Sequence, residues 1–431
     1  MIKRLSLALN VPHASINKWA KLISTFVVGQ GAVQLIQVLS GFFLIRWLSV
    51  EEYAQYSVAF AFQSTAQMLV EFGFSGSIVA LVGDRIYNKK VIGNYIKAGQ
   101  FYRNRFFVIV GGACIILFPL LTAKHHWPLT VTIALLICIL SNLFFSGNIS
   151  YYTPPLLIHQ RLHNLYRIQL KNGILRFLLI AVLYLFSVLN AWLAALTTSL
   201  LTVVNGYAYK KKASAFIEEP QKASVIVRKE MFDYIRPIMP GIVFAAFQGQ
   251  IMIFIISFFG QTMSIAEIGA LSRLGQLYLI FGVAGSALVA PYIAKQGKKD
   301  LLTKYATILS LYLVLSVALI ALAYMMPNLF LWIIGSNYSH LNTEVLLLIT
   351  NSGLALIVGI MWQMNAARKW IFYWMPIVSI PGTLLVQIVC ILYLNLSQTS
   401  EVLMLSIFTN LFVLFTRVLV GLVGFKKDNV L

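Results

Sequence analysis

Charged side chains are scarce in this sequence of 431 residues. Asp, Glu, Lys and Arg together make up 11% of it, whereas a soluble domain of ordinary composition has about 25%. Cysteine is rare too, because only Cys114, Cys138 and Cys390 occur, each within an apolar stretch and none in a CxxC spacing. These shortages exclude a soluble globular fold, a disulfide framework and a cysteine-based metal site.

The sequence is instead rich in long apolar runs. Hydrophobic residues make up 59% of the chain, and the mean hydropathy is +0.83. Runs of about 20 apolar residues suit membrane-spanning helices, whereas the strands of a membrane β-barrel alternate over about 10 residues. We therefore predict an all-α polytopic membrane protein with about twelve transmembrane helices. The predicted spans cover roughly 22–45, 54–82, 106–123, 129–150, 173–190, 191–209, 237–259, 265–292, 303–325, 344–364, 370–394 and 402–424.

The basic residues indicate an orientation in the membrane. The chain has 33 Lys and Arg against 13 Asp and Glu, a formal charge of +20 that would suggest nucleic acid in a soluble protein. All but four of them lie in the termini, in every second link between predicted spans, or within a turn of such a link. Arg46 and Lys124 fall on the opposite side, and Arg273 and Arg417 lie inside spans. The positive-inside rule then predicts cytoplasmic termini, and we expect no nucleic-acid partner.

The predicted spans divide into two sets of six. The longest basic link separates them, so we predict an N-terminal bundle over 1–210, a cytoplasmic linker over 211–236 and a C-terminal bundle over 237–431. The turn Leu-Ser-Val-Glu-Glu at 48–52 resembles Met-Ser-Ile-Ala-Glu at 263–267. Because each set has an even number of spans, the two bundles would be related by a pseudo-two-fold axis along the membrane normal, as in many transporters.

Signals of catalysis are missing. The sequence has no Walker motif, no HExxH, no DxD and no acidic pair at catalytic spacing. The links on the side opposite the basic residues are short, and the longest spans about 326–343. We therefore expect a protein that is not an enzyme and that binds neither a metal ion nor a cofactor.

Several predicted spans contain polar side chains, which are costly in a membrane and usually face the bundle interior or a cavity. The first and second spans each carry a stripe at helical spacing, and the seventh has an amide near its middle. We predict that these groups line a cavity able to bind sugar hydroxyls, with hydrogen bonding between helices as the alternative. They are Gln30, Gln34, Gln37, Gln63, Gln67, Glu71 and Gln248.

Arg273 is the most informative single residue. It lies about eight residues into the eighth predicted span, or roughly 12 Å from its outer end. An arginine at such a depth costs about 2.5–3.5 kcal/mol on insertion scales, and Gln276 lies on the same helix face. Since the planar guanidinium suits phosphate oxygens, we predict that Arg273 contacts an anion. Snorkelling to the outer interface, or pairing with Glu71 or Glu267, is the alternative.

Three other charged groups are further candidates. Arg46 ends the first predicted span and is either an interface anchor or a ligand. Arg417 lies within a turn or two of the basic face, where it could snorkel, or could share a cavity with Asn410 on the same helix face. Glu71 could carry a proton or pair with a basic residue. Coupling of transport to a proton or another cation therefore stays open.

Four segments resemble bacterial polysaccharide flippases. Residues 43–56 resemble the first external turn of that family, in which Arg and Leu-Gly/Ser precede Glu-Glu-Tyr-Gly-x-Tyr. Ala54 stands where the family usually has Gly. Glu-Phe-Gly-Phe at 71–74 and the segments 156–162 and 268–274 also resemble family segments, in the same order along the chain.

The chain is thus similar to Wzx-type O-antigen flippases of the multidrug/oligosaccharidyl-lipid/polysaccharide exporter superfamily. The resemblance implies a multi-pass protein of the bacterial inner membrane. Such a protein moves undecaprenyl-pyrophosphate-linked oligosaccharide units from the cytoplasmic to the periplasmic leaflet by alternating access. It implies a role in O-antigen or related lipopolysaccharide synthesis, with a polysaccharide polymerase and a chain-length regulator as partners. It also implies a cationic cleft for the head group, which Arg273 fits best.

Other functions compete with this expectation. A multidrug or small-molecule antiporter of the same superfamily would need a cluster of carboxylates, and only Glu71 lies well within a span. A membrane polysaccharide polymerase or ligase would need larger external loops. A scaffold without transport activity would not need the polar stripes.

Overall fold

The computed structural model describes residues 13–428, and side chains from Gly29 onward. Its described residues form helices and no strands, with 86% of the chain helical. The first half contains α2 (His13–Trp47), α3 (Val50–Glu71), α4 (Phe74–Val82), α5 (Lys89–Lys124), α6 (Leu129–Ile158), α7 (Leu162–Leu185) and α8 (Ala191–Ala213). The second contains α9 (Val225–Ile235), α10 (Met239–Gln248), α11 (Ile251–Phe259), α12 (Thr262–Gly275), α13 (Leu279–Ala284), α14 (Ala290–Ala294), α15 (Lys298–Met325), α16 (Pro327–Ile334), α17 (Asn342–Ala367), α18 (Trp374–Tyr393) and α19 (Thr399–Lys427).

Each of the twelve predicted spans overlaps described helix, so the all-α prediction is confirmed. Within residues 13–428, nine helices are long and apolar enough to cross a membrane. A tenth crossing is the pair Val225–Gln248 and Ile251–Phe259, which is bent by 55° at its break. The other two predicted spans are α2, which carries the glutamine stripe, and α12 to α14. A 3-10 turn and a π-helical turn at Gly285–Val289 interrupt the latter.

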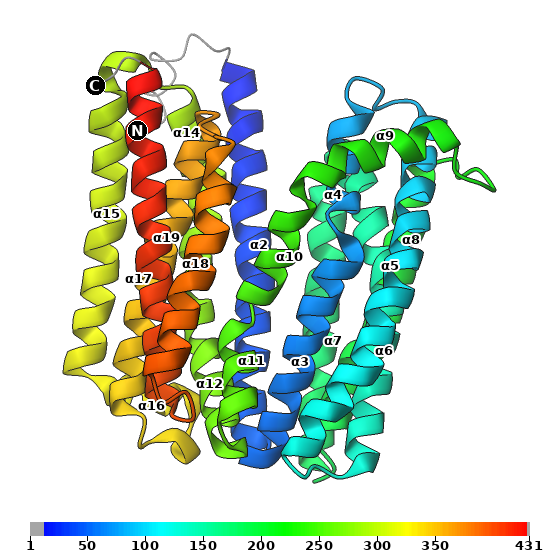
Figure 1. The fold of residues 1–431 in the computed structure, drawn as a ribbon. Coiled ribbons are helices and arrows are strands. Elements are labelled where there is room, and N and C mark those ends of the chain that lie inside the picture. The colour runs from blue at the N-terminus through cyan, green and yellow to red at the C-terminus, as the bar shows by residue number, and fades with distance from the viewer. Residues whose placement is uncertain (1–12, 429–431) are drawn as a thin grey trace.

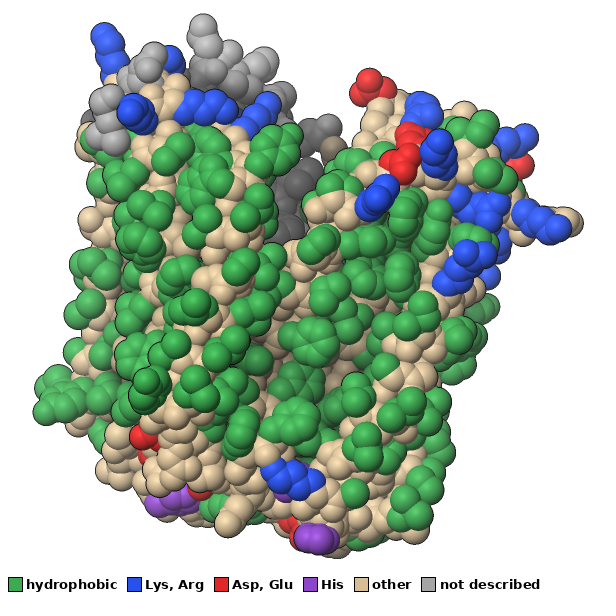
Figure 2. Space-filling model, viewed as in Figure 1, with side chains coloured by type: hydrophobic (Ala, Val, Ile, Leu, Met, Phe, Trp, Pro, Cys, Tyr) green, Lys and Arg blue, Asp and Glu red, His purple; other side chains and the backbone are tan. Residues whose placement is uncertain are grey.

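The helices form two lobes (Figure 1). Helices α3 to α9 make one lobe, α15 to α19 belong to the other, and α2 and α10 lie between them. The lobes meet at one end of the molecule and diverge toward the end where α9 and α14 lie. Lys and Arg side chains gather at this second end, and apolar side chains cover the middle of the visible face (Figure 2). We call it the basic end and the opposite one the closed end.

Close packing of α3 on α12 joins the lobes at the closed end. The Tyr53 hydroxyl donates to the carbonyl of Gly269 at 3.2 Å. A Cβ atom at Gly269 would lie 2.3 Å from the Ser57 hydroxyl, so a glycine is required for this approach. Deeper in the molecule, the Thr65 hydroxyl donates to the Ala246 carbonyl at 3.1 Å. These contacts join helices that are nearly 200 positions apart in the chain.

The two related turns at the closed end serve different purposes. Ser49 and Glu52 form a capping box at the start of α3, which satisfies two backbone N–H groups that the helix leaves free. In the second half, Glu267 receives hydrogen bonds from His340 and Thr399 instead. Glu267 therefore ties α12 to the starts of later helices, and it is not available to pair with Arg273.

The linker predicted over 211–236 is folded against the first lobe. Helix α9 packs on α4 and α5 at the basic end, with Met231 and Ile235 buried. The Glu219 carboxylate accepts a hydrogen bond from Tyr152 at 2.7 Å, and Glu230 accepts one from Tyr95 at 2.8 Å. Acidic residues of the linker thus hold it on tyrosines of the transmembrane helices.

Candidate functional site

A cavity of about 400 Å³ lies between the lobes, where α3 faces α10, α11, α12, α17 and α19. It contains three of the predicted residues, Gln248, Arg273 and Gln276, which come from two different predicted spans. Polar groups that line it also include Ser57, Gln250, Ser272, Asn351, Ser352, Ser406 and Asn410. No Asp or Glu lies among the lining residues in the described part of the chain.

Two interrupted helices open onto this cavity. Helix α10 ends at Gln248 and α11 begins at Ile251, while α12 gives way to a 3-10 turn at Gln276. No side chain caps the start of α11, and its first three residues, Ile251 to Ile253, line the cavity. Non-helical backbone at membrane depth is tolerated where it lines a cavity. The N-terminus of a helix carries partial positive charge, so α11 and Arg273 both favour an anion here.

Arg273 is positioned in the last turn of α12 by aromatic rings of α3. Its guanidinium lies over the Phe60 ring at 4.7 Å from the centroid, a cation–π contact. The phenols of Tyr53 and Tyr56 lie beside the same group. From α2, Gly41 allows the approach, because a Cβ atom there would lie 3.3 Å from Arg273 Cδ.

No carboxylate forms an ion pair with Arg273 among residues 13–428. The two acids considered as partners are engaged elsewhere, Glu71 with Arg103 and Glu267 with His340. The positive charge therefore remains available to a ligand. At an effective dielectric constant of about 20, a unit negative charge at about 4 Å would gain about 4 kcal/mol.

Paired amides form the wall of the cavity in the second lobe. Gln248 exchanges two hydrogen bonds with Gln387 of α18, at 3.0 and 2.9 Å. Asn410 donates to Asn351 at 2.7 Å, which joins α19 to α17. Gln387 and Asn351 were not predicted, since the only signal for each is an isolated amide in an apolar stretch. Each pair still has hydrogen-bonding capacity to spare for a ligand.

The glutamine stripe of α2 does not line this cavity. Gln30 and Gln37 instead line a second cavity of about 190 Å³, between α2 and the first lobe, together with Asn172 and Arg176. Gln34 lines neither of the two cavities. The spacing correctly placed Gln30 and Gln37 on one face, but only packing shows that this face turns toward α7 and α8.

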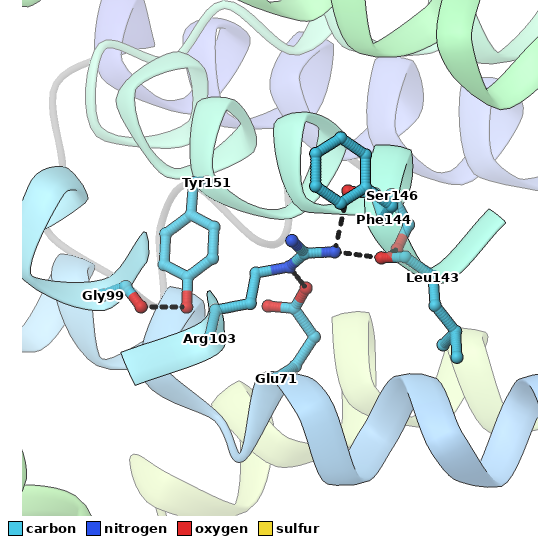
Figure 3. A network of polar contacts seen from close by, with 7 residues as sticks. All are labelled: Glu71, Gly99, Arg103, Leu143, Phe144, Ser146 and Tyr151. Atoms are coloured by element: carbon cyan, nitrogen blue, oxygen red, sulfur yellow. Dashed lines mark hydrogen bonds and ion pairs between the residues drawn. The ribbon is translucent and has the colours of Figure 1, made fainter. Parts of the chain in front are cut away.

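Glu71 lies in a polar network inside the first lobe (Figure 3). It forms an ion pair with Arg103 at 3.0 Å, and Arg103 also donates to the carbonyls of Leu143 and Phe144. Gly147 makes room for the guanidinium, since a Cβ atom there would lie 2.3 Å from Arg103 Cζ. The pairing with a basic residue that was considered for Glu71 is therefore what the structure shows.

Arg103 was expected in a link outside the membrane, and the structure shows that this was wrong. It falls in the link before the predicted third span, but α5 begins at Lys89, and Arg103 is only 4% exposed. Gln63 and Gln67, on α3 before Glu71, are half-buried and line neither cavity. Gln63, Gln67 and Glu71 therefore do not line a common cavity.

Arg46 connects the end of α2 to the end of α16. Its guanidinium donates to the carbonyls of Trp332 and Ile333 and lies 5.0 Å from the centroid of the Trp332 ring. Gly335, with φ of 105°, allows this approach, because a Cβ atom there would lie 3.2 Å from Arg46 Cγ. The carbonyls at a helix C-terminus are partly negative, so Arg46 caps α16.

Arg417 lies inside the second lobe, away from the cavity between the lobes. Its guanidinium is 4.5 Å from the centroid of the Trp362 ring, and its Nη1 is 3.2 Å from the Met375 sulfur. Asn410, two turns earlier on α19, does line the cavity. The two residues therefore do not share a cavity: Asn410 lines it, and Arg417 packs on the Trp362 ring.

We compared the chain with known protein families, curated proteins and solved structures, and only solved structures match it. No family model matches the sequence, and no curated protein matches it. The inward closed conformation of the lipid II flippase MurJ aligns with 94% of this chain and 89% of its own, at 13% identity and a TM-score of 0.68. A mutant of the Vibrio cholerae MATE transporter VcmN aligns with 96% of this chain and 98% of its own, at 13% identity and a TM-score of 0.62.

This chain has the fold of these transporters. The eukaryotic MATE transporter AtDTX14 is similar as well, covering 96% of this chain and 99% of its own at 16% identity, with a TM-score of 0.60. The fold has twelve helices in two lobes. It accounts for α2, the bent pair α10 and α11, and the interrupted α12 to α14 as the three crossings beyond the nine that are long and apolar enough by themselves among the described residues. The chain is thus a multi-pass membrane protein with a cavity between its lobes.

Proposed function

We propose that this protein flips undecaprenyl-pyrophosphate-linked oligosaccharide units across the bacterial inner membrane, for O-antigen or related surface polysaccharide synthesis. Arg273 carries the proposal, because it lies in the cavity between the lobes and has no carboxylate partner among the described residues. The diphosphate would bind at Arg273 and at the start of α11, where both groups favour negative charge. Hydroxyls of the oligosaccharide would meet the paired amides.

The position of this cavity between the lobes supports alternating access as the mechanism. The bundles 1–210 and 237–431 would rock about the contact of α3 with α12, with the basic end in the cytoplasm. Contact at the closed end then corresponds to a state that faces inward. The apolar outer surface allows the lipid tail to remain in the bilayer while the head group crosses. The fold shared with a lipid II flippase supports a substrate carried on a lipid.

A multidrug or small-molecule antiporter fits the site less well. Organic cations would need negative charge in the cavity, and none of the described lining residues is acidic. The buried Glu71 is already paired with Arg103, away from this cavity. The same neutral and cationic lining suits a diphosphate and its sugars.

Replacement of Arg273 tests the proposal. We expect Arg273→Ala to reduce surface polysaccharide about 10- to 100-fold, as expected for the loss of charge-assisted hydrogen bonds. Undecaprenyl-pyrophosphate-linked oligosaccharide should accumulate in the cytoplasmic leaflet. Arg273→Lys keeps the charge but loses the planar fork, so it should retain intermediate activity. Surface polysaccharide is quantified by gel and antibody, and the lipid-linked units by extraction and mass spectrometry.

Two outcomes would count against the proposal. Normal surface polysaccharide from an Arg273→Ala variant present at wild-type level in the membrane would remove the assigned role of the arginine. An unchanged polysaccharide profile in cells without the protein would remove the substrate class altogether. Immunoblotting of membrane fractions separates lost function from lost protein.

A further inference from the structure

The second cavity, between α2 and the first lobe, has a polar lining like the first and no role in the proposed diphosphate contact. It measures about 190 Å³ and lies between α2, α6, α7 and α8. Its lining is mainly amide and hydroxyl, with one arginine and no acidic residue in the described part of the chain. The amides come from Gln30, Gln37, Gln169, Asn172 and Asn205.

Four polar atoms of the residues that line this cavity are buried without a hydrogen-bond partner among the described residues. They are the Ser40 hydroxyl, the Gln169 carbonyl oxygen, Arg176 Nε and the Tyr209 hydroxyl. Ser40 is only 1% exposed. A buried polar atom that makes no hydrogen bond destabilises the fold. Four of them beside one cavity leave its lining residues with unmet hydrogen-bonding capacity, which an occupant of the cavity would satisfy.

The composition of the lining limits what this occupant can be. With an arginine and no carboxylate, the cavity disfavours cations, so it is a poor site for a coupling ion. Amide side chains each offer donors and acceptors side by side. Adjacent hydroxyls of a pyranose ring present the same mixed pattern, and the volume equals that of about six water molecules in the liquid. A single sugar ring matches both the size and the chemistry.

One tyrosine lies between the two cavities. Arg176 donates to the Tyr56 hydroxyl at 2.9 Å. The Tyr56 ring is stacked beside Phe60, with centroids 6.4 Å apart, and Phe60 carries the guanidinium of Arg273. Tyr56 thus lies between the arginine of one cavity and the arginine of the other. A ligand held at Arg273 would have its neighbouring groups close to the second cavity.

We propose that this second cavity is a subsite for one sugar ring of the lipid-linked oligosaccharide. Asn172 and Gln169 bind the hydroxyls of the ring, and Arg176 orients it from the side of Tyr56. The inference rests on the proposed function, since it takes the sugar to arrive on the same molecule as the diphosphate. It adds that the second cavity binds a sugar ring, while the cavity between the lobes binds the diphosphate.

Binding measurements on the purified full-length protein in nanodiscs test the subsite. The probes are undecaprenyl pyrophosphate and the undecaprenyl-pyrophosphate-linked glycan extracted from cells depleted of this protein. We expect the glycan-bearing lipid to bind more tightly to the wild type. Asn172→Leu should weaken that binding about five- to tenfold, as expected for one or two lost hydrogen bonds, and leave binding of the bare lipid unchanged. Asn164→Leu, on the same helix but outside the cavity, is the matched control.

The outcomes separate the two proposals. Equal binding of both lipids by the wild type and Asn172→Leu would mean that the cavity holds only water, and the subsite would be abandoned while the flippase proposal stood. Failure of the wild type to bind either lipid would contradict the proposed function itself. Glycan released from its lipid by mild acid is the third probe. If it bound as tightly as the intact molecule, the cavity would be a site for a soluble sugar instead.

Discussion

At the scale of single residues, the buried ion pair of Glu71 and Arg103 joins α3, α5 and α6 inside the first lobe. Its two side chains are 12% and 5% exposed. Two further hydrogen bonds to carbonyls of α6 satisfy the guanidinium. Removing one partner of such a pair leaves an uncompensated buried charge, which costs about 3–5 kcal/mol. Replacing both partners by apolar residues is often neutral.

We therefore predict that Arg103→Ala lowers the thermal unfolding midpoint of the detergent-purified protein by several degrees. The double replacement Glu71→Leu with Arg103→Met should recover most of the loss. Lys90, whose pair with Glu218 is largely exposed, provides the control, because Lys90→Ala should change stability by less than about 1 kcal/mol. If Glu71→Gln abolished transport with no change in stability, the carboxylate would carry a coupling proton, contrary to this assignment.

At the scale of elements, the contact of α3 with α12 depends on a missing side chain. A methyl group at Gly269 would collide with the Ser57 hydroxyl at 2.3 Å and would lie 3.2 Å from the Tyr53 ring. The helices would have to separate, and the hydrogen bond from Tyr53 to the Gly269 carbonyl would be lost. This glycine therefore determines how tightly the two lobes close at this end.

Gly269→Ala should lower the unfolding midpoint and reduce transport, although alanine is the better helix former by about 1 kcal/mol. Gly241→Ala is the matched control, because nothing lies within 4 Å of a Cβ atom at that position of α10. We expect this control to be neutral or slightly stabilising. Equal behaviour of the two variants in thermal unfolding and in polysaccharide export would show that the α3–α12 contact is not tight.

At the scale of the whole molecule, the proposed alternating access requires the contacts between the lobes at the closed end to open. Thr65 of α3 contacts the Ala246 carbonyl of α10 across the boundary between the lobes. Opening of the closed end must break this contact and the one at Gly269. A covalent link between the lobes at this level should therefore arrest the cycle.

We predict that a protein with Thr65→Cys and Ala246→Cys loses transport after treatment with a short bifunctional thiol reagent. The three native cysteines are first replaced by alanine. Cysteines at 142 and 202, which join α6 to α8 within one lobe where Asn142 now donates to Thr202 at 3.0 Å, are the control. Cross-linking there should leave transport intact. Full transport by a protein cross-linked between the lobes would rule out rocking about this contact.

The candidate site was predictable in part. Arg273 was conspicuous because a charge deep in an apolar span is costly, and the structure places it in a cavity with Gln248 and Gln276. The stripes of α2 and α3 suggested one common lining, yet Gln37 lies in the second cavity and Glu71 in an ion pair. Helical periodicity identifies the face of a helix and leaves its neighbour undetermined.

The sequence by itself determined the class of this protein. Hydropathy is a local property, so the twelve apolar spans and the basic end follow directly from the order of residues. Only the tertiary structure decided which polar groups meet. Arg273 and Phe60 are far apart in the chain, as are Arg176 and Tyr56, and each pair is joined by packing between helices. Such contacts depend on how whole helices bend, break and approach one another, which no local pattern encodes.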